Sequence, residues 1–217
     1  MEIKKESRTY ILTGTTSLLG SNPANPEIHA KFVTIKAANL ERKAEEEAML
    51  PGSEALAEAI RDIKEQGLTV FLRNNHGELV LGNHAIKGFF KGTLNTLKDQ
   101  TGITAVKSKV DNLLFISPTF IVIHRDGVPV TEPDGWNERP LRAETMQGPR
   151  VALASSEEID APWEIVFTVT LFENGGTARS KPLTWEAVEA ALDYGEWKGL
   201  GQWRNGGKGS FTWRRAE

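Results

Sequence analysis

Residues 164–172 constrain the fold of this chain most strongly. In the run from Glu164 to Phe172, the apolar residues fall on every second position: Ile165, Phe167, Val169 and Leu171. Successive side chains of a β-strand point to opposite faces, so this alternation predicts a strand with one face buried and the other face outside the core.

Three further stretches predict strands. Arg8 to Thr16 is rich in β-branched and aromatic residues and predicts the first strand. Leu113–Ile116 and Phe120–Ile123 flank Ser117-Pro118, which predicts a buried strand with a bulge or a break at the proline. Ser210–Trp213 predicts the last strand.

Two helices are predicted between these strands. The first runs from His84 to about Leu97, with Asn83 as its cap and Ile86, Phe89, Phe90, Leu94 and Leu97 at helical spacing. Gly88 and Gly92 lie one turn apart in it, and we interpret them as a face for tight helix–sheet packing. The second helix begins after the capping residue Thr184 and is predicted to close at Gly195.

The remaining chain is interpreted as insertions into a single domain of residues 1–217. The first covers about 18–83, with acidic helices at about 38–49 and 53–66 and a hairpin around 74–77. The second covers about 125–148 and is predicted to be a long polar loop.

Without these insertions the order is strand, helix, strand, strand, helix, strand. That order predicts an α+β fold, a ferredoxin-like or RNA-recognition-motif-like antiparallel sheet with two core helices on one face. In such folds the open sheet face and its rim commonly bind single-stranded RNA.

Composition excludes several other classes. The chain has no cysteine, which excludes disulfides, thiolate metal sites and a cysteine nucleophile and is compatible with the cytoplasm. No apolar run reaches the roughly 20 residues that span a bilayer, and the N-terminal residues lack the apolar core of a signal peptide, so no membrane association is expected. The four histidines share no metal-binding spacing, so neither a metal nor another cofactor is predicted.

Charge is unevenly distributed although the net charge is only −3. Residues 41–65 hold eight acidic and four basic residues. Residues 84–109 hold five lysines and one acid, and residues 195–217 hold five basic and two acidic residues. The basic segments contain the two glycine-bearing motifs described next, although a solvated charged face is the simpler interpretation of any one segment.

The first motif lies between the second helix and the last strand. Gly199-Leu200-Gly201 is followed by five residues, 202–206, and then by Gly207-Lys208-Gly209. Glycine tolerates positive φ and allows another backbone to come close. The second motif is Gly82-Asn83-His84-Ala85-Ile86-Lys87-Gly88-Phe89-Phe90-Lys91, at the start of the first helix.

The chain resembles the RAMP superfamily, which supplies the repeated backbone subunit of CRISPR effector complexes. The spacing of its glycine loop fits that family's G-rich loop, and residues 82–91 are similar to the family's motif at the start of the first core helix, with lysine at position 91 where arginine is frequent. A weaker likeness covers Arg142 to Pro162. The resemblance implies a ferredoxin-like core that holds RNA along a basic face.

The implied RNA-binding residues are the two helix lysines and the glycine loop: Lys87, Lys91, Gly199, Gly201, Arg204, Gly207, Lys208 and Gly209. Phosphate contact is one interpretation of these residues. The alternatives are a solvated basic face for the lysines and a purely structural turn for the loop. Trp203 is interpreted as a core residue beside Trp197, with base stacking as the alternative.

The resemblance also bears on catalysis. In family members that cut target RNA, a loop after the first strand carries a catalytic aspartate, whereas the matching loop here offers only Glu27 and His29 as ionisable residues. We therefore expect no catalytic residue and no enzyme. The expected partners are single-stranded RNA and either other CRISPR effector subunits or copies of this chain. Two alternatives stay open: a phage- or mobile-element-encoded interaction protein that mimics or sequesters a CRISPR component, and a metal-independent ribonuclease with His29 as its base.

Overall fold

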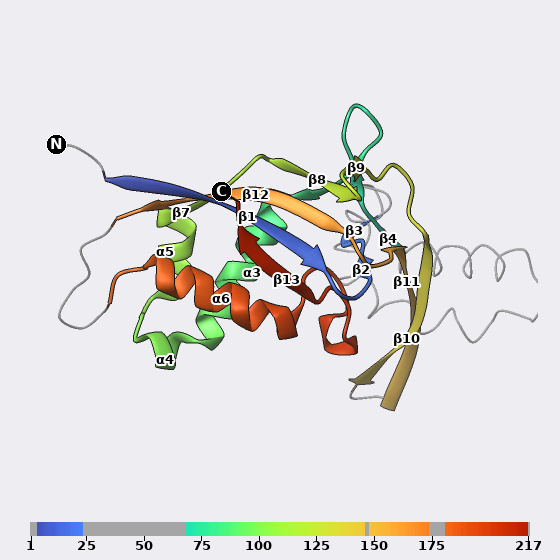
Figure 1. Ribbon diagram of the computed structural model, residues 1–217. Coiled ribbons are helices and arrows are strands. Elements are labelled where there is room, and N and C mark those ends of the chain that lie inside the picture. Colours follow the sequence, from blue (N-terminus) through green and yellow to red (C-terminus); the bar gives the residue numbers. More distant parts are fainter. Residues whose placement is uncertain (1–3, 24–67, 146–147, 174–180, 217) are drawn as a thin grey trace, which may run out of the picture. The chain divides into compact units, whose positions relative to one another are not determined.

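The computed structural model describes residues 4–23, 68–145, 148–173 and 181–216 (Figure 1). The chain forms two compact units, one of Met1–Leu19, Phe71–Asp134 and Glu158–Glu217, and the other of Gly20–Val70 and Gly135–Glu157. The predicted acidic helices at 38–49 and 53–66 lie outside the described residues. No helix within the described ranges is long and apolar enough to cross a membrane.

The first unit has the predicted core order. Its elements are β1 (Lys5–Gly14), α3 (Asn83–Thr96), β7 (Leu114–Ser117) with β8 (Phe120–Arg125), β12 (Glu164–Phe172), α6 (Trp185–Lys198) and β13 (Phe211–Arg215). Strand β1 lies between β13 and β12, and β12 pairs on its other side with β7 and β8, all antiparallel. This is the ferredoxin-like α+β arrangement, as the order of the elements predicted.

Further short elements extend this unit. Strands β5 (Leu72–Arg73) and β6 (Leu79–Gly82) form the predicted hairpin, and β6 pairs with β8, so the hairpin joins the main sheet. Strand β9 (Val128–Pro129) also pairs with β8. Two short helices, α4 (Lys98–Thr101) and α5 (Val106–Leu113), follow α3.

The core lies between the sheet and the helices. The alternating residues of β12 are confirmed as its buried face, since Ile165, Phe167 and Val169 are at most 1% exposed. The predicted apolar stripe of α3 is buried against them, and so is the apolar side of α6. Burial of this continuous apolar surface is the main term that stabilises the unit.

The glycines of the two core helices differ from our prediction. Gly195 does not close α6. The helix continues to Lys198, and Gly195 is buried inside it, where an added Cβ would lie 2.3 Å from the Phe89 ring and 2.7 Å from the Phe211 ring. Gly88 and Gly92 are exposed, and a Cβ at either would meet nothing within 4 Å, so the packing interpretation of that pair was wrong.

The two predicted helix caps have different outcomes. Thr184 is the N-cap of α6 and its side chain accepts a hydrogen bond from the Ala187 N–H, as expected. Asn83 does not cap α3, because the N-cap position falls on Gly82. The Asn83 side-chain amide instead donates to the Ile116 carbonyl at 3.1 Å, which ties the start of α3 to β7.

The prediction of a long loop at 125–148 was wrong. Most of that segment belongs to β9 and to β10 (Gly135–Thr145), which neighbours β11 (Gly148–Ile159) in a second sheet with β4 (Leu68–Val70) and β3 (Asn22–Pro23). Within the second unit the Arg139 guanidinium donates to the buried Ser156 hydroxyl at 3.1 Å. Backbone pairing forms β10 without the apolar alternation by which a half-buried strand is recognised in a sequence. The last two residues of β11, Glu158 and Ile159, belong to the first unit, within which they pair with β2 (Leu18–Leu19).

Candidate nucleic-acid interface

The ferredoxin-like sheet has one face that its helices do not cover. Figure 1 shows α3, α4, α5 and α6 together on the same side of β1 and β12. The register places odd-numbered residues of β1 and even-numbered residues of β12 on the opposite face, because their neighbours Tyr10, Leu12, Ile165 and Phe167 point into the core. We call this opposite side the outer face.

Paired hydroxyl groups occupy the middle of the outer face. Ser7 and Thr170 lie opposite each other with their oxygens 2.8 Å apart, and Thr9 and Thr168 form the next pair at 2.9 Å. Each hydroxyl can donate one hydrogen bond and accept others, so these pairs offer donors and acceptors to a ligand as well as to each other.

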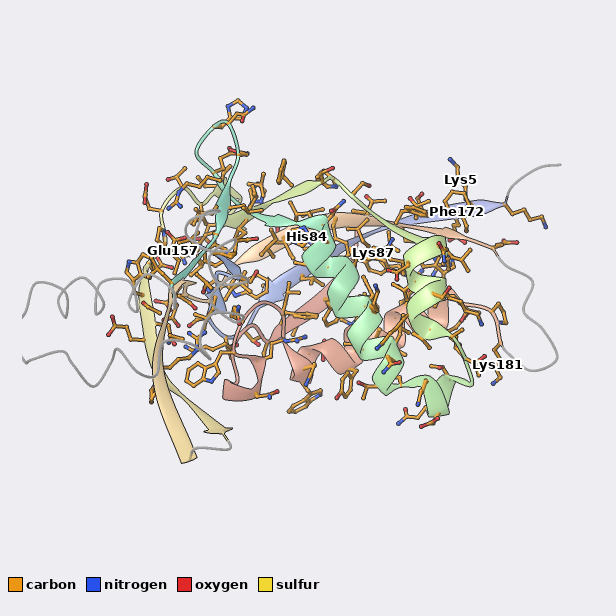
Figure 2. The ribbon with its side chains drawn as sticks, turned by 180° about the vertical axis from the view of Figure 1, so that it is seen from behind. Lys5, His84, Lys87, Glu157, Phe172 and Lys181 are labelled. Atoms are coloured by element: carbon orange, nitrogen blue, oxygen red, sulfur yellow. The ribbon has the colours of Figure 1, made fainter. Side chains whose placement is uncertain are left out.

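Two phenylalanines and one lysine lie at one end of the outer face, and a second lysine, from α3, contacts one of the rings. The Phe115 and Phe172 rings are edge to face with centroids 5.5 Å apart, and Phe115 is 47% exposed. Lys5 lies directly opposite Phe172 across the β1–β12 ladder, and the Lys87 ammonium lies 4.8 Å from the Phe115 centroid. Figure 2 shows Lys5 beside Phe172 and Lys87 on α3. We call Lys5, Lys87, Phe115 and Phe172 the aromatic–lysine cluster.

The opposite end of the same face is acidic. Glu164, the first residue of β12, lies opposite Thr13 on one side and His124 on the other. The charge along the outer face therefore changes from positive at the aromatic–lysine cluster to negative at the start of β12. A polyanion is attracted to the first end and repelled from the second.

The two predicted helix lysines meet a common partner in α5. The Lys87 ammonium donates to the Asp111 carbonyl at 2.9 Å, and Lys91 forms an ion pair with the Asp111 carboxylate. The charge of Lys91 is thus locally balanced. The acceptor of Lys87 is a neutral carbonyl, and two of the three N–H donors of an ammonium remain beside the one used there.

The glycine loop is closed by the protein's own backbone. Gly199, Gly201, Gly207 and Gly209 all have φ between +73° and +79°. An added Cβ at Gly199 would lie 2.5 Å from the Lys208 carbonyl oxygen, and one at Gly209 would lie 1.9 Å from that of Leu200. Gly199 and Gly209 therefore let two arms of the loop lie against each other, an arrangement that accounts for these two glycines without a ligand.

Hydrogen bonds fix this loop further. The Leu200 N–H donates to the Gly209 carbonyl at 2.9 Å, and the Gly209 N–H donates to the Ser17 carbonyl at 2.8 Å. Lys208 forms an ion pair with Glu158 at 2.7 Å, with both side chains largely buried. Arg204, at the start of the short 3₁₀ helix Arg204–Gly206, is exposed. Of the two loop cations predicted to contact RNA, Lys208 is paired and Arg204 is exposed to solvent.

The tryptophans near this loop are not core residues, so that interpretation was wrong. Trp197 is 86% exposed and Trp203 is 39% exposed. Trp203 has a φ of +51°, and its ring covers Gly206, where an added Cβ would lie 2.5 Å from the indole.

Our sequence interpretation missed the aromatic–lysine cluster. Its four members come from the start of β1, from α3, from β7 and from the end of β12, and only the register of the sheet brings them together. A signal was present at Phe115, because it lies between the two apolar residues Leu114 and Ile116 whose side chains point inward. A phenylalanine in that position of a half-buried strand has to face outward.

Electrostatic contacts also fix the periphery of the first unit. Arg125 donates to the Asp134 carboxylate with both of its terminal nitrogens, and Asp134 also accepts the Asp160 N–H at 2.7 Å. The Arg125 hydrogen bond, supported by the Asp160 N–H, lowers the pKa of Asp134 below its ordinary value.

Across the described residues, no group of three or more His, Asp or Glu side chains is arranged to hold a metal ion.

Comparison with known proteins gives limited similarity. No protein-family model matches the chain, and no curated protein matches it. Among solved structures, the chain is similar to a chain of the cryo-EM structure of the Type III-B Cmr-beta bound to cognate target RNA, with a TM-score of 0.47 and 10% sequence identity. The similarity covers 99% of this chain and 60% of that chain, so the present sequence spans less than two thirds of the solved chain's length.

Proposed function

We propose that this chain binds single-stranded RNA through its phosphates, without cleaving it, in the manner of a RAMP-like backbone subunit. The observation that carries the proposal is the outer face of the ferredoxin-like sheet, which combines hydroxyl pairs with an aromatic pair, one ring of it exposed, and with lysine at the same end. Proteins that bind single strands use this combination of basic groups for the backbone and aromatic rings for the bases.

Lys87 and Arg204 are the predicted residues best suited to contact phosphate. Both retain a charge that no carboxylate in the described contacts neutralises at short range, whereas Lys91 pairs with Asp111 and Lys208 pairs with Glu158. In this proposal Lys91, Lys208 and the four loop glycines act mainly by holding their elements in shape. The RNA partner is guide-like, and further partners are CRISPR effector subunits or copies of the chain itself.

The proposal is tested by fluorescence anisotropy with a labelled RNA of ~30 nucleotides at several salt concentrations. The double variant Lys87→Ala/Arg204→Ala removes two charges. The matched control is Lys98→Ala/Lys107→Ala, which removes two exposed lysines from α4 and α5. Each lost phosphate contact lowers the slope of log K against log salt by about 0.7 for a single strand, so the first pair should lower it by about 1.4 and the control should leave it unchanged.

Three results would redirect the proposal. Absence of binding at low salt would refute it and favour the interaction-protein alternative. Equal salt slopes for the two double variants would refute the assignment of Lys87 and Arg204. Shortened RNA products that disappear in His29→Ala would show a ribonuclease and contradict binding without cleavage.

A further inference from the structure

The aromatic–lysine cluster has three properties that together indicate a ligand. One of its rings is exposed, since nearly half of the Phe115 surface is accessible, and the other ring, Phe172, is half-buried. It is rigidly placed, because Phe115 and Phe172 both lie in strands of the main sheet and contact each other edge to face. Positive charge adjoins both rings, because Lys5 lies opposite Phe172 in the ladder and the Lys87 ammonium lies over the Phe115 ring.

A nucleotide base fits these properties. Every base has a π face that stacks on an aromatic side chain, and such stacking tolerates any sequence. A base on these rings would have phosphates on both sides of it along the strand, where the two lysines lie. The hydroxyl pair of Ser7 and Thr170 is one step further along the same two strands, within the region that the adjoining nucleotide would occupy.

A protein partner fits less well. An apolar segment that covered the rings would have to remove water from the flanking lysine ammonium groups without supplying charge to replace it. The rings also lead into a row of hydroxyl pairs rather than into a larger apolar surface. Charge complementarity therefore favours a polyanion whose repeating unit is flat and apolar on its faces.

We infer that Phe115 and Phe172 form a stacking subsite for one base of a single-stranded RNA, with Lys5 and Lys87 contacting the phosphates on either side. This inference rests on the proposed RNA binding and adds to it a defined position for a base. In this proposal the aromatic–lysine cluster contacts a base of the RNA, whereas the glycine loop contacts only the RNA backbone.

The test compares two probes of equal length, a labelled oligouridylate of ~12 nucleotides and its abasic counterpart, which keeps the ribose-phosphate backbone and lacks every base. Anisotropy gives the ratio of the two dissociation constants for the full chain and for its variants. Phe115→Ala removes the exposed ring, and Phe115→Trp keeps an aromatic face. Trp197→Ala is the control, because it removes an 86% exposed aromatic ring from α6, on the helical layer.

We expect the wild type to prefer the base-containing strand. Phe115→Ala should reduce that preference by about 5- to 140-fold, the range expected for one lost stacked base, while its affinity for the abasic strand stays the same. Phe115→Trp should retain the preference, and Trp197→Ala should leave it unchanged. Lys5→Ala should weaken the binding of both RNA probes equally and reduce the dependence of the affinity on salt concentration.

Two outcomes overturn the inference in distinguishable ways. If the wild type binds RNA but Phe115→Ala keeps the full preference, or loses affinity equally for both strands, the stacking subsite is refuted and the proposed RNA binding stands. If the wild type binds neither strand at low salt, the proposed function fails and the subsite fails with it. Thermal unfolding of each variant shows whether its fold is intact.

Discussion

Gly195→Ala in α6 gives a sharp test of the core, because two opposing effects can be weighed from the structure. In a solvent-exposed helix interior, replacing glycine by alanine stabilises a protein by about 1 kcal/mol. At Gly195 the new Cβ would lie 2.3 Å from one carbon of the Phe89 ring and 2.8 Å from a second, and 2.7 Å from the Phe211 ring. Real Cβ contacts are not this short, so both rings would have to move.

Both rings are buried in the core. Phe89 is 3% exposed and Phe211 is 1% exposed, and their centroids lie 5.8 Å apart in an edge contact. Overpacking of such a core costs about 1–3 kcal/mol, which exceeds the gain in helix propensity. Subtracting the gain of about 1 kcal/mol, we expect Gly195→Ala to lower the free energy of unfolding by up to about 2 kcal/mol.

The matched control is Gly88→Ala in α3, where an added Cβ meets nothing within 4 Å. That variant should raise the free energy of unfolding by about 0.5–1 kcal/mol. Urea denaturation followed by circular dichroism measures both changes at constant m-value. If Gly195→Ala proved as stabilising as Gly88→Ala, the packing of α6 on α3 and β13 described above would be wrong.

Three further predictions concern the glycine loop and its surroundings. Gly209 has φ +76°, and an added Cβ would lie 1.9 Å from the Leu200 oxygen, so Gly209→Ala should lower the melting temperature far more than Gly207→Ala. At Gly207, with φ +79°, an added Cβ meets nothing, and the substitution costs only the roughly 1–2 kcal/mol of the left-handed conformation. Similar losses for both variants would refute the close approach of the two arms. Glu158→Gln should destabilise the first unit by about 1–3 kcal/mol, measured by urea denaturation, because it leaves the Lys208 charge largely buried without its carboxylate; an unchanged midpoint would contradict that pairing. The pKa of Asp134 is lowered in the folded chain, so its contribution to stability is complete above the ordinary aspartate value of 3.8 and is lost as the pH falls through the lower folded value. Asp134→Asn should therefore reduce stability at neutral pH and flatten its dependence on pH in that acidic range, and a chain as acid-sensitive as the wild type would show that Asp134 does not carry the effect.

The sequence was sufficient for the ferredoxin-like core because its elements carry strong local patterns. The alternation of β12 and the helical spacing of α3 each depend on burial of one face, and that burial is what the structure shows. The order of those elements then leaves few topologies, because a split strand–helix–strand unit places its two strands on either side of a third.

The role of Gly195, the course of β10 and the candidate site depend on contacts between distant residues, which no local sequence pattern reveals. Gly195 and Gly199 both lie near the end of a helical run, and only the position of Phe89 shows that Gly195 serves packing while Gly199 ends the helix. Strand β10 carries mainly polar residues, and its pairing with β11 is made by the backbone. The candidate site was predicted in part: Lys87 was identified from its position at the start of α3, but Phe115, Phe172 and Lys5 become neighbours only through strand register.

Crosslinking of single-stranded RNA to the chain tests the central claim most directly. An RNA in which uridines are replaced by 4-thiouridine is bound at low salt and irradiated, and the crosslinked peptides are identified by mass spectrometry. If the outer face binds RNA, the crosslinks fall in β1, β7 and the end of β12, with Phe115 or Phe172 among the modified residues. Crosslinks confined to the helical layer, for instance at the exposed Trp197 of α6, would contradict the account.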